Sequence, residues 1–145
     1  MPRAGHVPLT WLTQPMMQAF AELQSAGHAH SFEVWDAQGK LVGGGFGVTV
    51  GRVFVTESQF SCVSNASKVG FAELNRHLAA WGFLLNDCKF HTPTLQEMGF
   101  SAMPRSAYNR LLSDNLGFAK GRHWQFLAAP VASNSHVRPV LKRAA

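Results

Sequence analysis

The spacing of apolar residues predicts a helix at the start of the chain and strands after it. An amphipathic helix is expected between Thr13, which can cap it, and Gly27, because apolar residues recur there every three or four positions. These apolar positions are Met16, Met17, Phe20 and Leu23. We expect this apolar face to lie in the core. From residue 32 apolar and polar residues alternate, and breaks at DAQG and at residues 50–51 predict three antiparallel strands, the last reading RVFVTES.

Helices and a further strand alternate in the second half. A helix is expected from Ser64 or Asn65 to Gly82, and a strand over residues 83–90 that starts like a buried one. A short helix, PTLQEMGF, and a last helix, PRSAYNRLLSDN, follow. Hairpin strands followed by alternating helix and strand predict an α+β fold, a mixed α/β sandwich whose mostly antiparallel sheet is flanked by helices.

Three consecutive glycines, Gly43, Gly44 and Gly45, interrupt the second strand. Glycine weakens a strand, so either another group approaches the backbone closely there or the strand bulges or bends. The residues alone leave both interpretations open.

The composition indicates one compact domain. Of the 145 residues, 46% are hydrophobic and 14% are charged, which excludes a disordered chain. Cys62 and Cys88 belong to no CxxC pair and are expected to be reduced thiols, and no histidine pattern points to a metal, so no metal is assigned. An apolar leader and an 18-residue apolar run are both lacking, so we expect a cytoplasmic protein.

Positive charge is concentrated in the last part of the chain. Lys and Arg total 13 against 8 acids, and residues 115–145 contain basic residues but no acid. Such a tail predicts a polyanionic partner such as nucleic acid, although a merely solvated tail has the same composition. Trp124 and Phe126 are expected to form a final strand within an otherwise irregular segment.

The strand over residues 83–90 ends in charged residues, FLLNDCKF. Because side chains on a strand alternate, Asp87 and Lys89 are expected on one face, with Glu57 close by at the end of the RVFVTES strand. These three residues would then form a cluster in a cleft, and the alternative is a surface ion pair contributing at most about 1 kcal/mol. The helix start after SNASK, with Lys68 beside free backbone N–H groups, is a candidate site for a phosphate or carboxylate.

Several blocks in one collinear order over about residues 10–108 carry a family resemblance: TWLTQPMMQAFAELQSAGHAHSFEVW, LVGGGFGV, GRVFVTESQFS, NASK, NDCKFHTP and MPR. They resemble the bacterial leucyl/phenylalanyl-tRNA-protein transferase family. The resemblance implies a GNAT-like catalytic domain, here residues 1–114, followed by a basic extension over 115–145 that packs in part on it. The family's small N-terminal domain, which helps to hold tRNA, lies outside the resemblance.

The resemblance also implies a reaction and its partners. The family moves an amino acid from aminoacyl-tRNA, the co-substrate, to an amine, and no separate cofactor is implied. The acceptor would be a protein N-terminus, a peptide or a small molecule. No membrane partner is expected, and the oligomeric state is left open.

Site residues follow from the same blocks. Glu57 and Asp87 belong to the implied reaction centre, and Trp11 lies beside the terminal adenosine of the tRNA. The LVGGGFGV and ESQF segments line the implied aminoacyl pocket, and the NASK helix start adds further binding residues. The implied binding residues are therefore Trp11, Gly43, Gly44, Gly45, Phe46, Ser58, Gln59, Phe60, Asn65, Ser67 and Lys68.

Two positions depart from the family pattern. The family has DCQ where this chain has Lys89 after Asp87 and Cys88, and GESMF where this chain has Gln59 within TESQF. Gln59 must find hydrogen-bond partners that a methionine does not need, which disfavours leucine and phenylalanine as the transferred group, as does Gly45 in place of a bulkier residue.

The catalytic hypothesis assigns one role to each charged residue. Asp87 accepts a proton from the amine, Glu57 supports it electrostatically, and Lys89 steadies the oxyanion or binds an acidic acceptor. Lys89 could instead neutralise Asp87 and leave a silent module that binds tRNA or another partner. A third interpretation is an acetyl-CoA-dependent N-acetyltransferase, which ranks lower because the usual glycine-rich loop before the NASK helix is missing.

Overall fold

The structure is a computed structural model that describes residues 10–117, Trp124 and residues 137–140. Its helices and strands, in chain order, are α1 (Gln14–Ser25), β1 (Ala29–Asp36), β2 (Leu41–Val50), β3 (Val53–Ser61), α2 (Ala66–Ala80), β4 (Leu85–Asp87), α3 (Pro93–Glu97), α4 (Arg105–Asn115) and β5 (Val137–Val140). In this part of the chain no helix is both long and apolar enough to cross a membrane.

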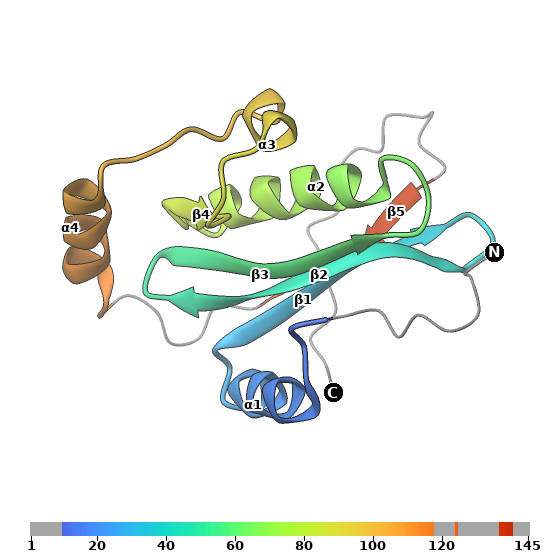
Figure 1. Cartoon of the computed structure of the whole chain (residues 1–145), viewed down its shortest axis with the longest axis horizontal. Coiled ribbons are helices and arrows are strands. Elements are labelled where there is room, and N and C mark those ends of the chain that lie inside the picture. Colours follow the sequence, from blue (N-terminus) through green and yellow to red (C-terminus); the bar gives the residue numbers. More distant parts are fainter. Residues whose placement is uncertain (1–9, 118–123, 125–136, 141–145) are drawn as a thin grey trace.

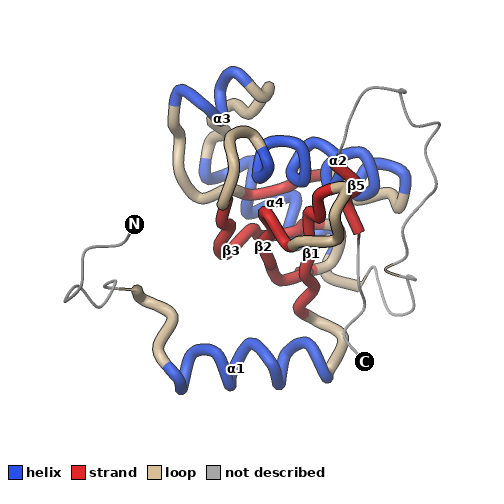
Figure 2. Tube along the Cα trace, turned by 90° about the vertical axis from the view of Figure 1, so that its right-hand side faces the viewer, coloured by secondary structure: helices blue, strands red, loops and turns tan. Residues whose placement is uncertain are grey.

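The five strands form one sheet in the order β4-β3-β2-β1-β5 (Figure 1). β4 runs parallel to β3, and every other neighbouring pair is antiparallel. Helix α2 covers one face of this sheet and α1 lies on the other side (Figure 2). The predicted α+β fold with a mostly antiparallel mixed sheet is therefore confirmed.

The core lies between α2 and the sheet. Its largest fully buried side chains include Phe32 and Val34 of β1, Phe54 of β3, and Phe71 and Leu74 of α2. Burial of such side chains is the main favourable term in folding, at roughly 25 cal/mol per Å² of apolar surface. This contact therefore fixes α2, and with it the start of that helix, against the first three strands.

The glycines of β2 are explained by close approach of other parts of the chain. A Cβ on Gly43 would lie 3.0 Å from the Cβ of Ala66 at the start of α2, and one on Gly45 would lie 2.8 Å from the ring of Phe32. β2 also carries an extra residue, Val42, immediately before the glycines, because Val34 pairs with Gly43 whereas Trp35 pairs with Leu41. Both of the interpretations left open by the sequence thus apply.

The expectation that α1 faces the core is wrong. Within the described chain α1 has no buried residue, and Met16, Met17 and Leu23 are all exposed. Its contact with the sheet runs through the half-buried Phe20, whose ring lies 4.9 Å from that of Phe46. Apolar periodicity reports that a helix has an apolar face, but it does not report what covers that face.

The strand expected over residues 83–90 is much shorter in the structure. β4 has three residues, all of them half-buried, and Leu84 before it is 49% exposed. A three-residue strand at the sheet edge buries too little apolar surface for its side-chain pattern to be read reliably.

The C-terminal part also differs from expectation. Trp124 is buried but lies outside any strand, packing on His30 and Phe54, while Phe126 lies outside the described residues. Residues 137–140, expected to be irregular, form β5 and pair with β1. This pairing uses backbone groups of distant segments, which leave no local signature in the sequence. The boundary between residues 114 and 115 stays a prediction.

Gly70→Ala should destabilise the fold. A Cβ at Gly70 would lie 2.5 Å from a methyl of Val34 and 2.9 Å from the ring of Phe32, both fully buried. Overpacking of this kind typically costs about 1–3 kcal/mol, more than the roughly 1 kcal/mol that alanine gains over glycine in a helix. Urea unfolding should show a lower free energy of unfolding.

The double variant Gly70→Ala/Val34→Ala is the matched control. Shortening Val34 removes the methyl group that a Cβ at Gly70 would clash with. The double variant should therefore lose less unfolding free energy than the two single variants lose together. Strict additivity, or a Gly70→Ala variant more stable than the parent, would contradict the close packing of α2.

Candidate active site

A β-bulge places Glu57 in the middle of β3. In the register of β2 with β3, Phe46 opposes Ser58 and Gly47 opposes Thr56, so Glu57 is the extra residue. Glu57 therefore does not end its strand, as the sequence had suggested, because β3 continues to Ser61. A bulge re-aims the side chains that follow it.

The bulge brings Thr56 and Gln59 to the same face of the sheet. They oppose Gly47 and Gly45, which are two residues apart on β2 and so share a face. Without an extra residue, two positions three apart would point to opposite faces. Both side chains consequently lie on the face that α2 covers.

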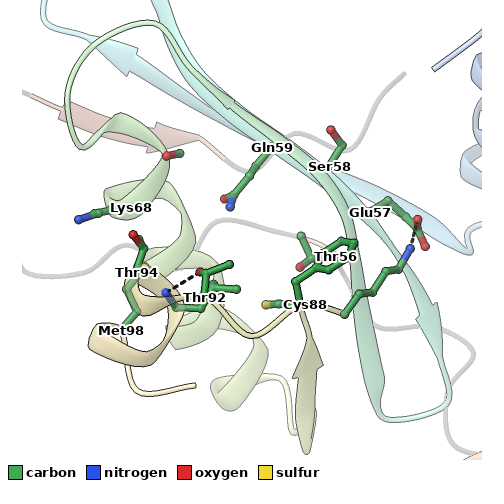
Figure 3. A pocket seen from close by; sticks show the side chains of 13 residues that line it. Thr56, Glu57, Ser58, Gln59, Lys68, Cys88, Thr92, Thr94 and Met98 are labelled. Carbon is green, nitrogen blue, oxygen red and sulfur yellow. Dashed lines mark hydrogen bonds and ion pairs between the residues drawn. The ribbon is translucent and has the colours of Figure 1, made fainter. Parts of the chain in front are cut away.

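A tight turn after β4 carries Lys89 back toward β3. Asp87 Oδ1 accepts the backbone N–H of Lys89 at 2.7 Å, and Lys89 has a φ of 63°, in the left-handed region. The Lys89 ammonium forms an ion pair with a carboxylate oxygen of Glu57 (Figure 3). The Glu57 side chain is only 15% exposed, so the pair is not a fully solvated surface contact.

The arrangement of Glu57, Asp87 and Lys89 differs in part from the one expected from the sequence. Lys89 lies beyond the end of β4, so it does not share a strand face with Asp87. Its ammonium pairs with Glu57 rather than neutralising Asp87, while Asp87 is held by the backbone of the same residue. The structure nevertheless links Glu57, Asp87 and Lys89 by direct contacts.

Tyr108 of α4 is a neighbour of Asp87 that the sequence did not suggest. The pKa of Tyr108 is raised to about 12, mainly by burial and also by a hydrogen bond with Asp87 and the charge of that carboxylate, while the charge of Arg105 acts in the opposite direction. The hydroxyl therefore keeps its proton near neutral pH and can donate it to Asp87 in a hydrogen bond. Tyr108 is the only tyrosine of the chain, but no spacing rule connects a residue of α4 with the end of β4.

Cys88 points into the same region but is a poor nucleophile. Its pKa is raised to about 12, mainly by burial and also by the charge of Asp87, while a hydrogen bond with Thr56 acts in the opposite direction. Since the thiolate is the reactive form, Cys88 is expected to be inert near neutral pH.

A cavity of about 350 Å³ lies beside this cluster, between β3, the start of α2, the turn after β4, and α3 (Figure 3). The predicted site residues that line it are Glu57, Ser58, Gln59, Ser67, Lys68 and Lys89. Lining residues that the sequence did not indicate are Thr56, Cys88, Phe90, Thr92, Thr94, Leu95 and Met98. In the second group, Thr56, Cys88, Phe90 and Thr92 lie in the same blocks as the first group, whereas Thr94, Leu95 and Met98 reach the cavity only through the path of the chain after β4.

The remaining predicted binding residues lie outside this cavity. Trp11 packs on Phe20 at 6.1 Å between ring centroids, and Phe20 packs on Phe46, so these rings form a cluster on the α1 side of the sheet. The others are Gly43, Gly44, Gly45, Phe60 and Asn65, none of which is among the described residues that line the cavity. Asn65 is the N-cap of α2, with a φ of 65°. Their assignment to substrate binding stays a prediction.

The wall of the cavity at Thr56 is backed by a chain of hydrogen bonds. The Thr56 hydroxyl donates to Asn86 Oδ1 at 2.8 Å, and Asn86 Nδ2 donates to Asn75 Oδ1 of α2 at 2.7 Å. These bonds fix the orientation of polar groups between the sheet and α2. Among the described residues, no group of three His, Cys, Asp or Glu side chains is placed to hold a metal ion.

A family model described as leucyl/phenylalanyl-tRNA protein transferase matches residues 2–113. The chain belongs to this family. A relative named leucyl/phenylalanyl-tRNA–protein transferase from Pseudomonas syringae pv. syringae (strain B728a) is 48% identical over 115 residues, 79% of this chain and 50% of the relative. One of the same name from Teredinibacter turnerae is 48% identical over 107 residues, 74% of this chain and 41% of the relative. The chain thus spans about half the length of the curated relatives it matches or somewhat less.

Alkylation should separate the two cysteines. At pH 8 a thiol with a pKa of about 12 is ionised in only about one molecule in 10⁴, so Cys88 should react far more slowly than the exposed Cys62. Its rate should rise about tenfold per pH unit up to its pKa. Iodoacetamide labelling followed by peptide mass spectrometry measures both rates.

Asp87→Asn should speed the labelling of Cys88, because it removes a negative charge that raises the pKa of that thiol. Asp114→Asn, the same change at an exposed position of α4, should not. If Cys88 reacted as fast as Cys62 at pH 8 in the parent protein, the described burial of this thiol would be wrong.

Proposed function

We propose that this chain carries the aminoacyl-transfer centre of its family. It would form an amide bond between an amino acid carried by tRNA and an amine acceptor, in the first place the N-terminus of a protein. The observation that carries the proposal is the linked cluster of Glu57, Lys89 and Asp87 beside a cavity, in a chain of this family. The relatives are named as transferases that use a tRNA and a protein, in agreement with this reaction.

In the proposed step the acceptor amine attacks the carbonyl carbon of the aminoacyl ester. A C–N bond forms, the ester C–O bond breaks, and the terminal ribose oxygen of the tRNA leaves as a hydroxyl. Asp87 takes the proton that the amine loses, and this proton then passes to the leaving oxygen. The backbone N–H of Lys89 and the hydroxyl of Tyr108 orient the Asp87 carboxylate for this role.

Lys89 has two possible effects on this chemistry. Paired with Glu57 at the cavity, its ammonium is placed to stabilise the negative charge that develops on the carbonyl oxygen. The same pairing could occupy Glu57 and leave a module that binds aminoacyl-tRNA without reacting. We propose the first role, because Lys89 lines the cavity and its side chain is 39% exposed, so a substrate can reach it.

The charge of the chain is suited to a tRNA partner. A formal net charge of +5 favours association with a polyanion, and such binding weakens steeply as salt is added. We propose aminoacyl-tRNA as the co-substrate and no further cofactor. A reaction that consumes aminoacyl-tRNA would take place in the cytoplasm, where we propose the protein acts.

Transfer of label from charged tRNA tests the proposal. The full chain is incubated with tRNA pools, each charged with one radiolabelled amino acid, and with a mixture of peptides and small amines, and labelled amide product is counted. Asp87→Asn should lower the rate by about 10²–10⁴-fold, the range typical for loss of a general base. Asp114→Asn, which makes the same change on an exposed surface, should have no effect.

Lys89→Gln decides between the two roles of the lysine. If Lys89 stabilises the oxyanion, the variant should lose activity while Glu57→Gln loses it as well. A gain of activity in Lys89→Gln would show that the lysine had been blocking Glu57. The mechanism would be overturned if Asp87→Asn had the same turnover rate as the parent and unfolded at the same urea concentration.

A further inference from the structure

Under the proposed function the cavity beside Glu57 receives the side chain of the transferred amino acid, and we propose that Gln59 makes this cavity select a side chain that ends in a carboxamide or carboxylate. The inference rests on the proposed function and deepens it by naming the kind of amino acid that is transferred. This kind differs from the leucine and phenylalanine for which the relatives are named. Its basis is the chemistry of the cavity wall, as four observations show.

The cavity has the place and size that a bound amino-acid side chain requires. Glu57 and Lys89 form part of its wall, so a side chain inside it holds the attached ester next to the charged cluster. Its volume of about 350 Å³ is at the lower end for a small-ligand pocket, so it can accommodate an amino-acid side chain but is small for a large cofactor.

Gln59 lines this cavity with a side-chain amide that has no hydrogen-bond partner among the described residues. Its side chain points from β3 into the space between Lys68 and Thr56 (Figure 3). No other residue in the described part of the chain forms a hydrogen bond with this amide, unlike Asn86 behind it, which is bonded to both Thr56 and Asn75. An amide offers both a donor and an acceptor, which matches a carboxamide in either orientation and a carboxylate through its N–H groups.

The rest of the wall divides into an apolar and a polar part. Leu95 and Met98 of the α3 region can pack on the methylene groups of a side chain such as glutamine or glutamate. Thr92 and Thr94 add hydroxyl groups on the side that faces Gln59 (Figure 3). The cavity therefore combines apolar contact for a stem with hydrogen bonds for a polar end.

The charges of the wall also permit a carboxylate. Glu57 and Lys89 are paired with each other, which leaves the positive charge of Lys68 as the excess charge of the described lining. A leucine or phenylalanine side chain in the same place would displace water from the Gln59 amide without replacing its hydrogen bonds. Leaving a polar group unsatisfied in this way opposes binding.

The test measures binding and transfer separately. Four stable analogues are used, in which glutamine, glutamate, leucine or phenylalanine is joined by an amide to the 3′ position of adenosine. Calorimetric titration of the full chain should give about tenfold tighter binding for the glutamine or glutamate analogue than for the other two. Gln59→Met should reverse the order, and Gln38→Met, the same change in the β1–β2 turn, should leave it as in the parent.

Because a carboxylate is charged and a carboxamide is not, the effects of salt and of removing Lys68 distinguish these two end groups. The carboxylate is assigned if the glutamate analogue binds more tightly and this preference weakens with added salt and is lost in Lys68→Met. The carboxamide is assigned if the glutamine analogue binds more tightly and neither added salt nor Lys68→Met changes this preference. Tighter binding of the leucine or phenylalanine analogue, an order unchanged by Gln59→Met, or no binding of any analogue would each overturn the inference.

The transfer assay tells this failure from failure of the proposed function. Transfer of leucine or phenylalanine, with glutamine and glutamate excluded, supports the transferase and overturns the inference. The expected binding order without transfer from any charged tRNA supports the specificity of the cavity and overturns the proposed reaction.

Discussion

The close packing of α2 against β1 and β2 is the constraint on which the site depends. Gly70 lets the helix lie directly over Val34 and Phe32, and Gly43 leaves room for Ala66 at its first turn. A side chain at either glycine would lift the helix away from the sheet. Because Ser67 and Lys68 follow Ala66, the same packing places them over the second half of β3, where they form one wall of the cavity.

Two irregularities of the backbone then turn a sheet edge into a site. The bulge at Glu57 lets Thr56 and Gln59 face α2 together, and the left-handed conformation of Lys89 returns its side chain to β3. A non-glycine residue in that conformation costs roughly 1–2 kcal/mol. The hydrogen bond from its N–H to Asp87 and the ion pair with Glu57 offset this cost, so local strain and the charged cluster belong to one arrangement.

The sheet separates two groups of residues that the resemblance assigns to substrate binding. Gln59 lines the cavity on the α2 side, whereas Phe46 belongs to the aromatic cluster with Phe20 and Trp11 on the α1 side. Along β2, alternation sends Gly45, which opposes Gln59, and its neighbour Phe46 in the same block to opposite faces. A block is therefore not a single surface, and a substrate that touched both groups would have to pass around the edge of the sheet.

The sequence by itself determined the order of most helices and strands, the family, and the three charged residues that meet at the site. It could do so because local periodicity, caps and recognisable blocks are properties of neighbouring residues. Tertiary structure alone decided the pairing of β5 with β1, the bulge at Glu57, the contact of Tyr108 with Asp87 and the exposure of α1. Each of these depends on which distant segment lies alongside, and backbone pairing and burial between distant segments leave no periodic trace in either segment.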